Sequence, residues 1–149
     1  MTDVAFYHLQ RSRLDDVLPS LLTKTIDAGK RAVVIVGSEA RVEQLDGALW
    51  AFDPASWLPH GSRRDGNPGE QPIWLTDADE NPNRAEFLFL ADGASSADVA
   101  AFERCFVLFD GNDDTAVAES RESWKAYKAA GHDVTYWKQG DRGWERQGE

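Results

Sequence analysis

The sequence predicts an α/β fold with a mostly parallel central sheet, and two observations support this prediction. The first fifty residues alternate between strand-like and helix-like patterns. Residues 32–36 are continuously apolar, which is typical of a strand buried on both faces of a parallel sheet. A strand, a helix and a second strand in this order imply a right-handed crossover. The length of 149 residues fits one domain over residues 1–149 and suffices to bury a core.

The N-terminal half contains the clearest helical patterns. Residues 4–9 are predicted to form a strand, which is followed by an amphipathic helix over residues 13–28. Pro19 lies inside this pattern, so the helix either begins near it or is kinked there. A second helix is predicted over residues 40–52, and the Gly- and Pro-rich segment 54–72 is predicted to be an exposed loop.

The second half predicts further strands and one more helix. We expect strands at residues 73–75, 86–90, 104–109 and 134–137, a helical turn at 96–101 and a helix at 115–130. Asp113 and Asp114 precede this helix, where carboxylates cap free amides and suit the helix dipole, so capping explains them better than a metal pair. Residues 139–149 are polar and predicted to be a frayed tail, although Trp144 could fold back on the body.

Composition excludes several classes of protein. A formal net charge of −10 and a pI near 4.7 argue against broad binding to nucleic acid, which needs cations. No run approaches the ~20 apolar residues of a membrane span, and the N-terminus lacks a signal-like segment, so a cytoplasmic protein is expected. Cys105 is the single cysteine, which excludes an internal disulfide, and its apolar surroundings predict an inert core position.

The sequence lacks the common motifs of catalysis and cofactor binding. Around the Gly29-Lys30 pair, a phosphate loop would need a glycine where Lys24 stands and Ser or Thr where Arg31 stands. No Gly-x-Gly-x-x-Gly follows the first strand, and the three histidines show no metal-ligand spacing. We therefore expect no catalytic residue, no cofactor and no metal. A small nucleotide-binding enzyme stays as the alternative.

The segment most informative about function is residues 119–131. Its spacing brings four side chains to one side of the last helix: Arg121, Trp124, Lys125 and Lys128. Residues 121–138 hold four basic and two acidic residues, a local balance of +2, so the rest of the chain carries −12. This cationic, aromatic stripe predicts a docking site for something short, acidic and partly apolar. A solvated helix face with a few lysines is the alternative.

Two stretches resemble the chi subunit of bacterial DNA polymerase III. One is Leu45-Asp-Gly-Ala-Leu-Trp-Ala51 with Ser56-Trp-Leu-Pro-His60, and the other is Arg121-Glu-Ser-Trp-Lys-Ala-Tyr-Lys-Ala-Ala-Gly131 with Tyr136-Trp-Lys138. The Phe6-Tyr7 pair and Ala28-Gly-Lys-Arg-Ala-Val-Val34 also fit, so the resemblance spans essentially the whole chain. It implies a non-catalytic accessory protein of the clamp-loader complex. The implied fold is a three-layer α/β/α domain similar to nucleotide-binding domains but without their phosphate loop.

The resemblance also implies partners. Members of this family bind the acidic C-terminal tail of single-stranded DNA-binding protein, and they bind the psi subunit, which tethers them to the clamp loader. The tail site maps onto Arg121, Trp124, Lys125 and Lys128, with Val117 at the pocket wall. Arg121 would engage the terminal carboxylate, the lysines the acidic residues upstream, and Trp124 the terminal phenyl ring. Better-known members have Tyr in place of Trp124 and a basic residue in place of Val117.

The psi-type surface maps onto a second set of residues: Trp50, Trp57, Pro59 and His60. An exposed aromatic pair there would be a plausible hot spot, whereas the alternative is that both tryptophans close the core under the loop. Since psi is not evident in every lineage with a chi-like protein, the surface could serve an equivalent partner, the clamp loader directly, or a DNA repair helicase. Little direct DNA binding and no membrane contact are expected.

Overall fold

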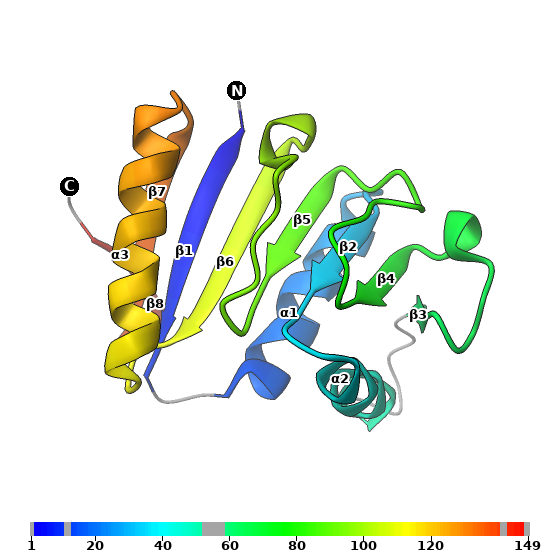
Figure 1. Ribbon diagram of the computed structural model, residues 1–149. Coiled ribbons are helices and arrows are strands. Elements are labelled where there is room, and N and C mark those ends of the chain that lie inside the picture. The colour runs from blue at the N-terminus through cyan, green and yellow to red at the C-terminus, as the bar shows by residue number, and fades with distance from the viewer. Residues whose placement is uncertain (1, 11–12, 52–58, 141–142, 148–149) are drawn as a thin grey trace.

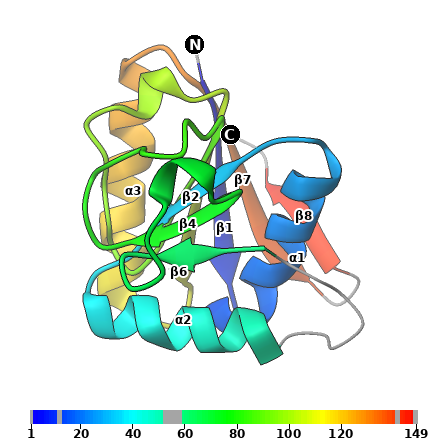
Figure 2. The ribbon, with the colours of Figure 1, turned by 90° about the vertical axis from the view of Figure 1, so that its right-hand side faces the viewer.

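The centre of the molecule is a twisted sheet between helices (Figures 1 and 2). The computed structural model describes residues 2–10, 13–51, 59–140 and 143–147. Within these residues the sheet has eight strands in the order β3-β4-β2-β5-β6-β1-β7-β8. Neighbouring strands run parallel except β8, which is antiparallel to β7. The predicted α/β class with a mostly parallel sheet is confirmed.

The predicted strands and helices occur in the predicted order, and the structure adds β3, η1 and β8 to them. The strands are β1 (Asp3–Leu9), β2 (Ala32–Ile35), β3 (Gly61–Ser62), β4 (Ile73–Thr76), β5 (Phe87–Leu90), β6 (Arg104–Asp110), β7 (Asp133–Gly140) and β8 (Gly143–Gln147). The α-helices are α1 (Leu14–Asp27), α2 (Glu39–Ala51) and α3 (Asp114–Ala129), and two short 3-10 turns are η1 (Pro68–Glu70) and η2 (Val99–Ala101).

The helices lie on both faces of the sheet because the chain crosses it in two directions. The connection from β1 through α1 to β2 runs toward the β3 edge, whereas that from β6 through α3 to β7 runs toward the β8 edge. Crossovers of this kind are right-handed, so opposite directions put α1 and α3 on opposite faces. Figure 2 shows the sheet between these two helices. The carboxyl ends of β1 and β6, where the directions diverge, lie side by side.

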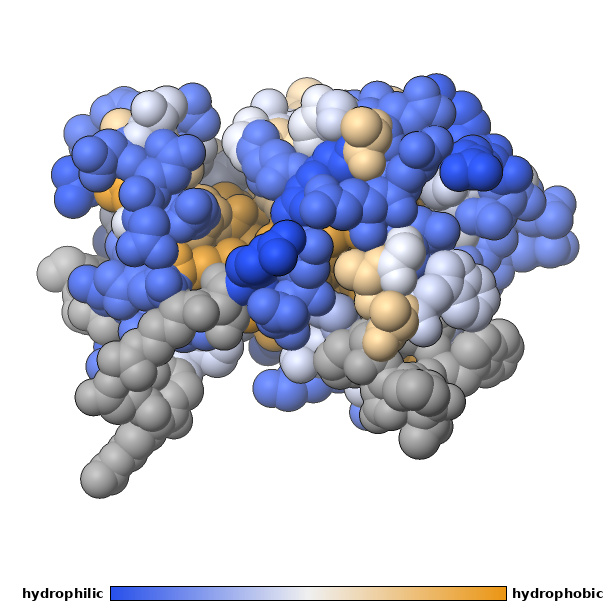
Figure 3. All heavy atoms as spheres, turned by 90° about the horizontal axis from the view of Figure 1, so that it is seen from below, coloured by the Kyte–Doolittle hydropathy of each residue, from blue (hydrophilic) through white to orange (hydrophobic). Residues whose placement is uncertain are grey.

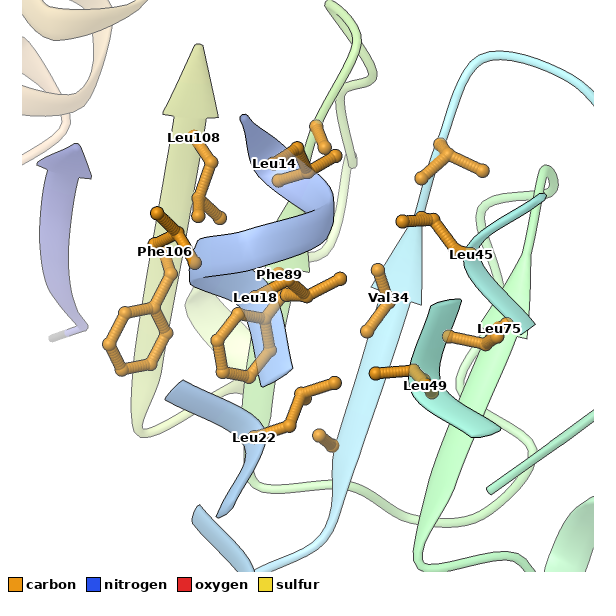
Figure 4. Close-up of a cluster of buried hydrophobic side chains, with 14 of the residues drawn as sticks. Leu14, Leu18, Leu22, Val34, Leu45, Leu49, Leu75, Phe89, Phe106 and Leu108 are labelled. Atoms are coloured by element: carbon orange, nitrogen blue, oxygen red, sulfur yellow. The ribbon is translucent and has the colours of Figure 1, made fainter. Parts of the chain in front are cut away.

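Each face has its own apolar core, because alternate residues of a strand point to opposite faces. On one face α1 and α2 pack on Val34, Phe89, Phe106 and other buried side chains (Figure 4). On the other face α3 packs over Phe6, Cys105 and Phe109. The continuous apolar runs in β2 and β5 thus serve both cores at once, as the pattern of a parallel sheet predicts.

Two local predictions differ from the structure or extend beyond it. Helix α1 begins at Leu14, five residues before Pro19, rather than near the proline. The segment predicted as an exposed loop contains β3 and η1, and its residues 54–58 lie outside the described residues. β3 has only two residues, Gly61 and Ser62, which is too short for a periodic signal.

The C-terminal residues predicted to be a frayed tail include strand β8. Its backbone pairs with β7 from Tyr136 opposite Gln147 to Gly140 opposite Gly143. Trp144 folds back, and its ring contacts Tyr7 edge-on with ring centroids 4.9 Å apart. This aromatic contact and the backbone pairing explain how so polar a segment becomes a strand.

None of the helices in the described part of the chain combines the length and the apolar composition needed to cross a membrane.

Candidate partner-binding surfaces

Helix α3 carries the predicted cationic stripe, and its start is fixed by a side-chain cap. Oδ1 of Asp113 accepts hydrogen bonds from the backbone amides of Thr115 at 2.9 Å and Ala116 at 3.3 Å. The capping role predicted for Asp113 is confirmed. Asp114 follows in the first turn, where its negative charge suits the positive end of the helix dipole.

The cations of the stripe are solvent-exposed. Arg121 has no hydrogen-bond or ion-pair partner among the described residues, so its planar guanidinium is available to an anion. Lys125 lies 3.6 Å from the carboxylate of Glu122, but both side chains are highly exposed, and such pairs contribute little. Lys128 extends over the ring of Trp124, with its Nζ 5.3 Å from the ring centroid.

Trp124 is half-buried rather than a fully open wall. Its ring contacts Phe6 at a centroid distance of 5.8 Å and Tyr136 at 5.9 Å, both in edge-on geometry. The inner part of the indole thus belongs to the core under α3, and Lys128 lies over the ring. Val117, one turn before Arg121, is also half-buried and packs against the same core. The stripe therefore combines exposed cations with the half-buried apolar side chains of Trp124 and Val117.

Two residues absent from the predicted site lie beside the stripe. The hydroxyl of Tyr136 on β7 lies 2.5 Å from Nδ1 of His8 on β1. Burial raises the pKa of Tyr136, and the positive charge of Arg121 partly offsets this, so the phenol lies within reach of the charge of Arg121. No local pattern could have joined His8 to Tyr136, because 128 residues separate them and only the pairing of β1 with β7 brings them together.

The predicted psi-type surface centres on Trp50. This tryptophan is 61% exposed, and among the described residues it is the large hydrophobic side chain that projects into solvent. His60 differs from Trp50, because its side chain is fully buried and its Nε2 lies 3.0 Å from Oδ1 of Asp46. The two rings contact each other at a centroid distance of 4.8 Å, so His60 supports Trp50 from below. Pro59 is half-buried, and Trp57 lies outside the described residues.

The carboxyl ends of the strands border a cleft of about 620 Å³. Figure 3 looks onto this edge and shows a hollow with an apolar floor between hydrophilic rims. Open α/β sheets bind nucleotides at such a position, with phosphates on the amides of a helix N-terminus. In this protein the Asp113 carboxylate already accepts hydrogen bonds from the first amides of α3.

The charges around the cleft also disfavour a phosphate. Three carboxylates line it besides Asp113, namely Asp92, Asp110 and Glu119. Arg41, a cation of the lining, is engaged with carboxylates of Asp15 and Asp92, each at 3.0 Å. A phosphate there would meet like charges, and the first amides of α3 are already bonded to Asp113.

The single cysteine is a buried core residue. Cys105 is completely buried, and burial raises the pKa of its thiol to about 12, so it stays protonated as the apolar run predicts. Within the described ranges, no group of three or more His, Cys, Asp or Glu side chains is arranged to hold a metal ion.

Comparison with known proteins gives a consistent result. A sequence model of the family described as "DNA polymerase III chi subunit, HolC" matches residues 1–135. The probable DNA polymerase III subunit chi of Rickettsia prowazekii (strain Madrid E) is 26% identical over 109 residues, which cover 73% of this chain and 66% of that protein. The DNA polymerase III subunit chi of Escherichia coli (strain K12) is 25% identical over 141 residues, covering 90% of this chain and 96% of that protein.

Proposed function

Because the chain belongs to the DNA polymerase III chi subunit family, we propose that it is a non-catalytic adaptor in DNA replication. Its α3 surface binds the acidic C-terminal tail of single-stranded DNA-binding protein. Its Trp50 surface binds the psi subunit or an equivalent partner and so links that protein to the clamp loader.

The observation that carries the first half of the proposal is the exposed cation group on α3 of an acidic protein. Arg121, Lys125 and Lys128 face solvent beside the partly exposed rings of Trp124 and Tyr136. A tail that ends in acidic residues, an apolar Pro-Phe unit and a free carboxylate offers the complementary charges and a ring. The strongly negative remainder of the chain repels acidic segments elsewhere, which favours this one face.

The second half of the proposal is supported by the exposed Trp50 ring. Exposed tryptophans held rigidly by their surroundings are typical hot spots of protein interfaces. The buried His60 contacts the ring and lies 3.0 Å from Asp46, so the indole of Trp50 packs against a buried side chain that restricts it on that side. A rigid indole loses little conformational entropy when a partner covers it. Figure 1 shows α2 near the β3 edge of the sheet and α3 near the β8 edge, so the two partners would use separate surfaces.

Tail binding is tested by fluorescence anisotropy with a labelled C-terminal peptide of the cognate single-stranded DNA-binding protein. We expect wild-type binding that weakens as salt rises, because part of the affinity is electrostatic. Arg121→Ala should weaken binding roughly tenfold or more through loss of a charge-assisted hydrogen bond. Lys125→Ala should weaken it by a smaller factor.

Lys24→Ala is the matched control, because it removes one exposed cation from α1 on the opposite face and changes the net charge equally. Its affinity should equal that of the wild type at each salt concentration. Affinities unchanged by both α3 substitutions would contradict the assignment of the tail to this helix. A wild-type protein that binds no tail peptide at either salt concentration would contradict the adaptor function itself.

The Trp50 surface is tested with purified psi subunit or, where psi is missing, purified clamp loader. Trp50→Ala should weaken this complex roughly thirtyfold, as truncation of a hot-spot tryptophan typically does. Tail-peptide binding should not change. Equal affinity of Trp50→Ala and wild type for the clamp-loader partner would refute this surface as the clamp-loader contact and leave a repair helicase as its candidate partner.

A further inference from the structure

Tyr136 lies just past residues 1–135, the part of the chain that the family sequence model matches. Its ring contacts Trp124 edge-on, and Trp124 is three residues from Arg121 on the same helix face. The phenol therefore borders the surface on which the tail is proposed to bind. Which way its hydroxyl hydrogen points depends on His8.

His8 is 8% exposed, and its two ring nitrogens have very different surroundings. Nδ1 lies 2.5 Å from the Tyr136 hydroxyl oxygen, whereas Nε2 is buried without a hydrogen-bond partner. Nε2 lies against the backbone of Gly111, where an added Cβ atom would be only 2.0 Å away. A hydrogen on Nε2 would be a buried donor without an acceptor, which is costly.

The favoured neutral form of His8 therefore carries its hydrogen on Nδ1. Burial lowers the pKa of His8, and the positive charge of Lys138 lowers it further, so the ring is neutral near pH 7. In this form Nδ1–H donates to the Tyr136 oxygen. The hydroxyl hydrogen of Tyr136 must then point away from His8, and no described residue accepts it.

We infer that the Tyr136 hydroxyl, oriented by His8, donates a hydrogen bond to the terminal carboxylate of the ligand that Arg121 pairs with. One carboxylate oxygen would face the guanidinium and the other the phenol. This inference rests on the proposed tail-binding function. It adds Tyr136 as a contact residue and His8 as a positioning residue that reaches the ligand only through Tyr136.

A carboxylate suits this pair of donors better than a neutral group. The Arg121 side chain supplies charge and the Tyr136 hydroxyl a directional donor, and the half-buried Trp124 ring that contacts Tyr136 lowers the local exposure to water. A terminal amide would offer one acceptor oxygen and no charge. The site should therefore discriminate a free C-terminus from an amidated one.

The test compares tail peptides that end in a carboxylate or in an amide, with wild type, Tyr136→Phe and Tyr127→Phe. Wild type should bind the acid peptide at least tenfold more tightly than the amide peptide. Tyr136→Phe should bind the acid peptide roughly tenfold more weakly than wild type and the amide peptide about equally. Tyr127→Phe is the matched control, since Tyr127 packs on the same Phe6 ring but lies outside this hydrogen-bond pair.

His8 is tested by rescue. His8→Leu removes the donor to Tyr136 and should lower the preference for the acid peptide, whereas His8→Asn keeps a donor near Nδ1 and should restore much of it. Urea unfolding of each variant at pH 7 verifies that it is folded during the titrations. Equal affinities of wild type and Tyr136→Phe for the acid peptide would overturn this inference and leave tail binding intact. A wild type that binds neither peptide would overturn the proposed function and this inference with it.

Discussion

Position 111 shows how one residue is constrained by a neighbour far away in the sequence. A Cβ atom there would lie 2.0 Å from the His8 ring and 2.9 Å from the carbonyl oxygen of Leu9. The backbone amide of Gly111 also donates a hydrogen bond to this carbonyl at 2.7 Å, so the backbone at Gly111 cannot move away from Leu9 without breaking it. Glycine is required here by space, and the close packing fixes the His8 ring against Tyr136.

His8 should make the stability of the protein depend on pH. Burial and the charge of Lys138 lower its pKa from the ordinary value near 6.5, and the negative charge of Asp110 opposes this only in part. As the pH falls through 6.5, His8 becomes protonated in the unfolded chain before it does so in the folded protein. The free energy of unfolding is therefore not reduced by His8 above pH 6.5, and it decreases as the pH falls below that value.

Urea unfolding at pH 7.5, 6.5 and 5.5 measures this effect. The free energy of unfolding of wild type should fall between pH 6.5 and 5.5 more steeply than that of His8→Asn. The difference in slope has an upper bound of about 1.4 kcal/mol per pH unit, the value for one proton. His60 and His132 are present in both proteins, so the difference isolates His8. Identical slopes would show that His8 is no more difficult to protonate in the folded state.

At the level of the elements, α3 separates two surfaces of opposite character. One flank exposes Arg121 and Lys125, while Glu119 lines the acidic cleft at the carboxyl ends of the strands. The helix can hold both surfaces apart because Asp113 fixes its start and the aromatic packing of Trp124 on Phe6 fixes its rotation. A change in the cap would therefore affect stability without touching the ligand surface.

Asp113→Ala should lower the free energy of unfolding by about 1 kcal/mol, because it frees two amides of the first turn. Asp113→Asn keeps the acceptor oxygen and is the matched control, so it should cost much less. Urea unfolding measures both variants, and tail-peptide affinity should stay within about twofold of wild type because the cap is remote from the stripe. If the alanine and asparagine variants were equally stable, the hydrogen bonds of the cap would contribute nothing measurable.

At the level of the whole molecule, the reversal of chain direction at β1 and β6 creates the crevice where related architectures bind nucleotides. In this protein four carboxylates line the crevice, and the first amides of α3 beside it are already bonded to Asp113. The cations are instead gathered on the outer flank of α3. Charge distribution over the same architecture thus favours an acidic protein segment at the helix over a nucleotide at the strand ends.

Much of the fold could be predicted because its signals are local. The apolar runs of β2 and β6, the stripe of α1 and the cap at Asp113 each lie within a short window of sequence. The elements with weak signals were harder to predict. β3 has two residues, and β8 is polar and depends on pairing with β7 and on the contact between Trp144 and Tyr7.

Part of the candidate tail site could also be predicted from local sequence, and part depends on the tertiary structure. Helical spacing alone groups Arg121, Trp124 and Lys125, and the residue types alone indicate an acidic, partly apolar ligand. Their exposure and the burial of part of Trp124 depend on what lies beneath the helix. His8 and Tyr136 join the site only through the pairing of β1 with β7, and no sequence window contains both.

The sequence by itself determined the α/β class, the order of most strands and helices, the helix cap and the grouping of cations on one helix face, because these depend on contacts between near neighbours. Only the tertiary structure decided that His60 is buried against Trp50, that Trp144 packs on Tyr7 and that His8 lies within hydrogen-bond distance of the Tyr136 hydroxyl. Those contacts join residues on different strands and helices. The physical reason is that burial and hydrogen-bond geometry depend on how the sheet is assembled, which local patterns do not encode.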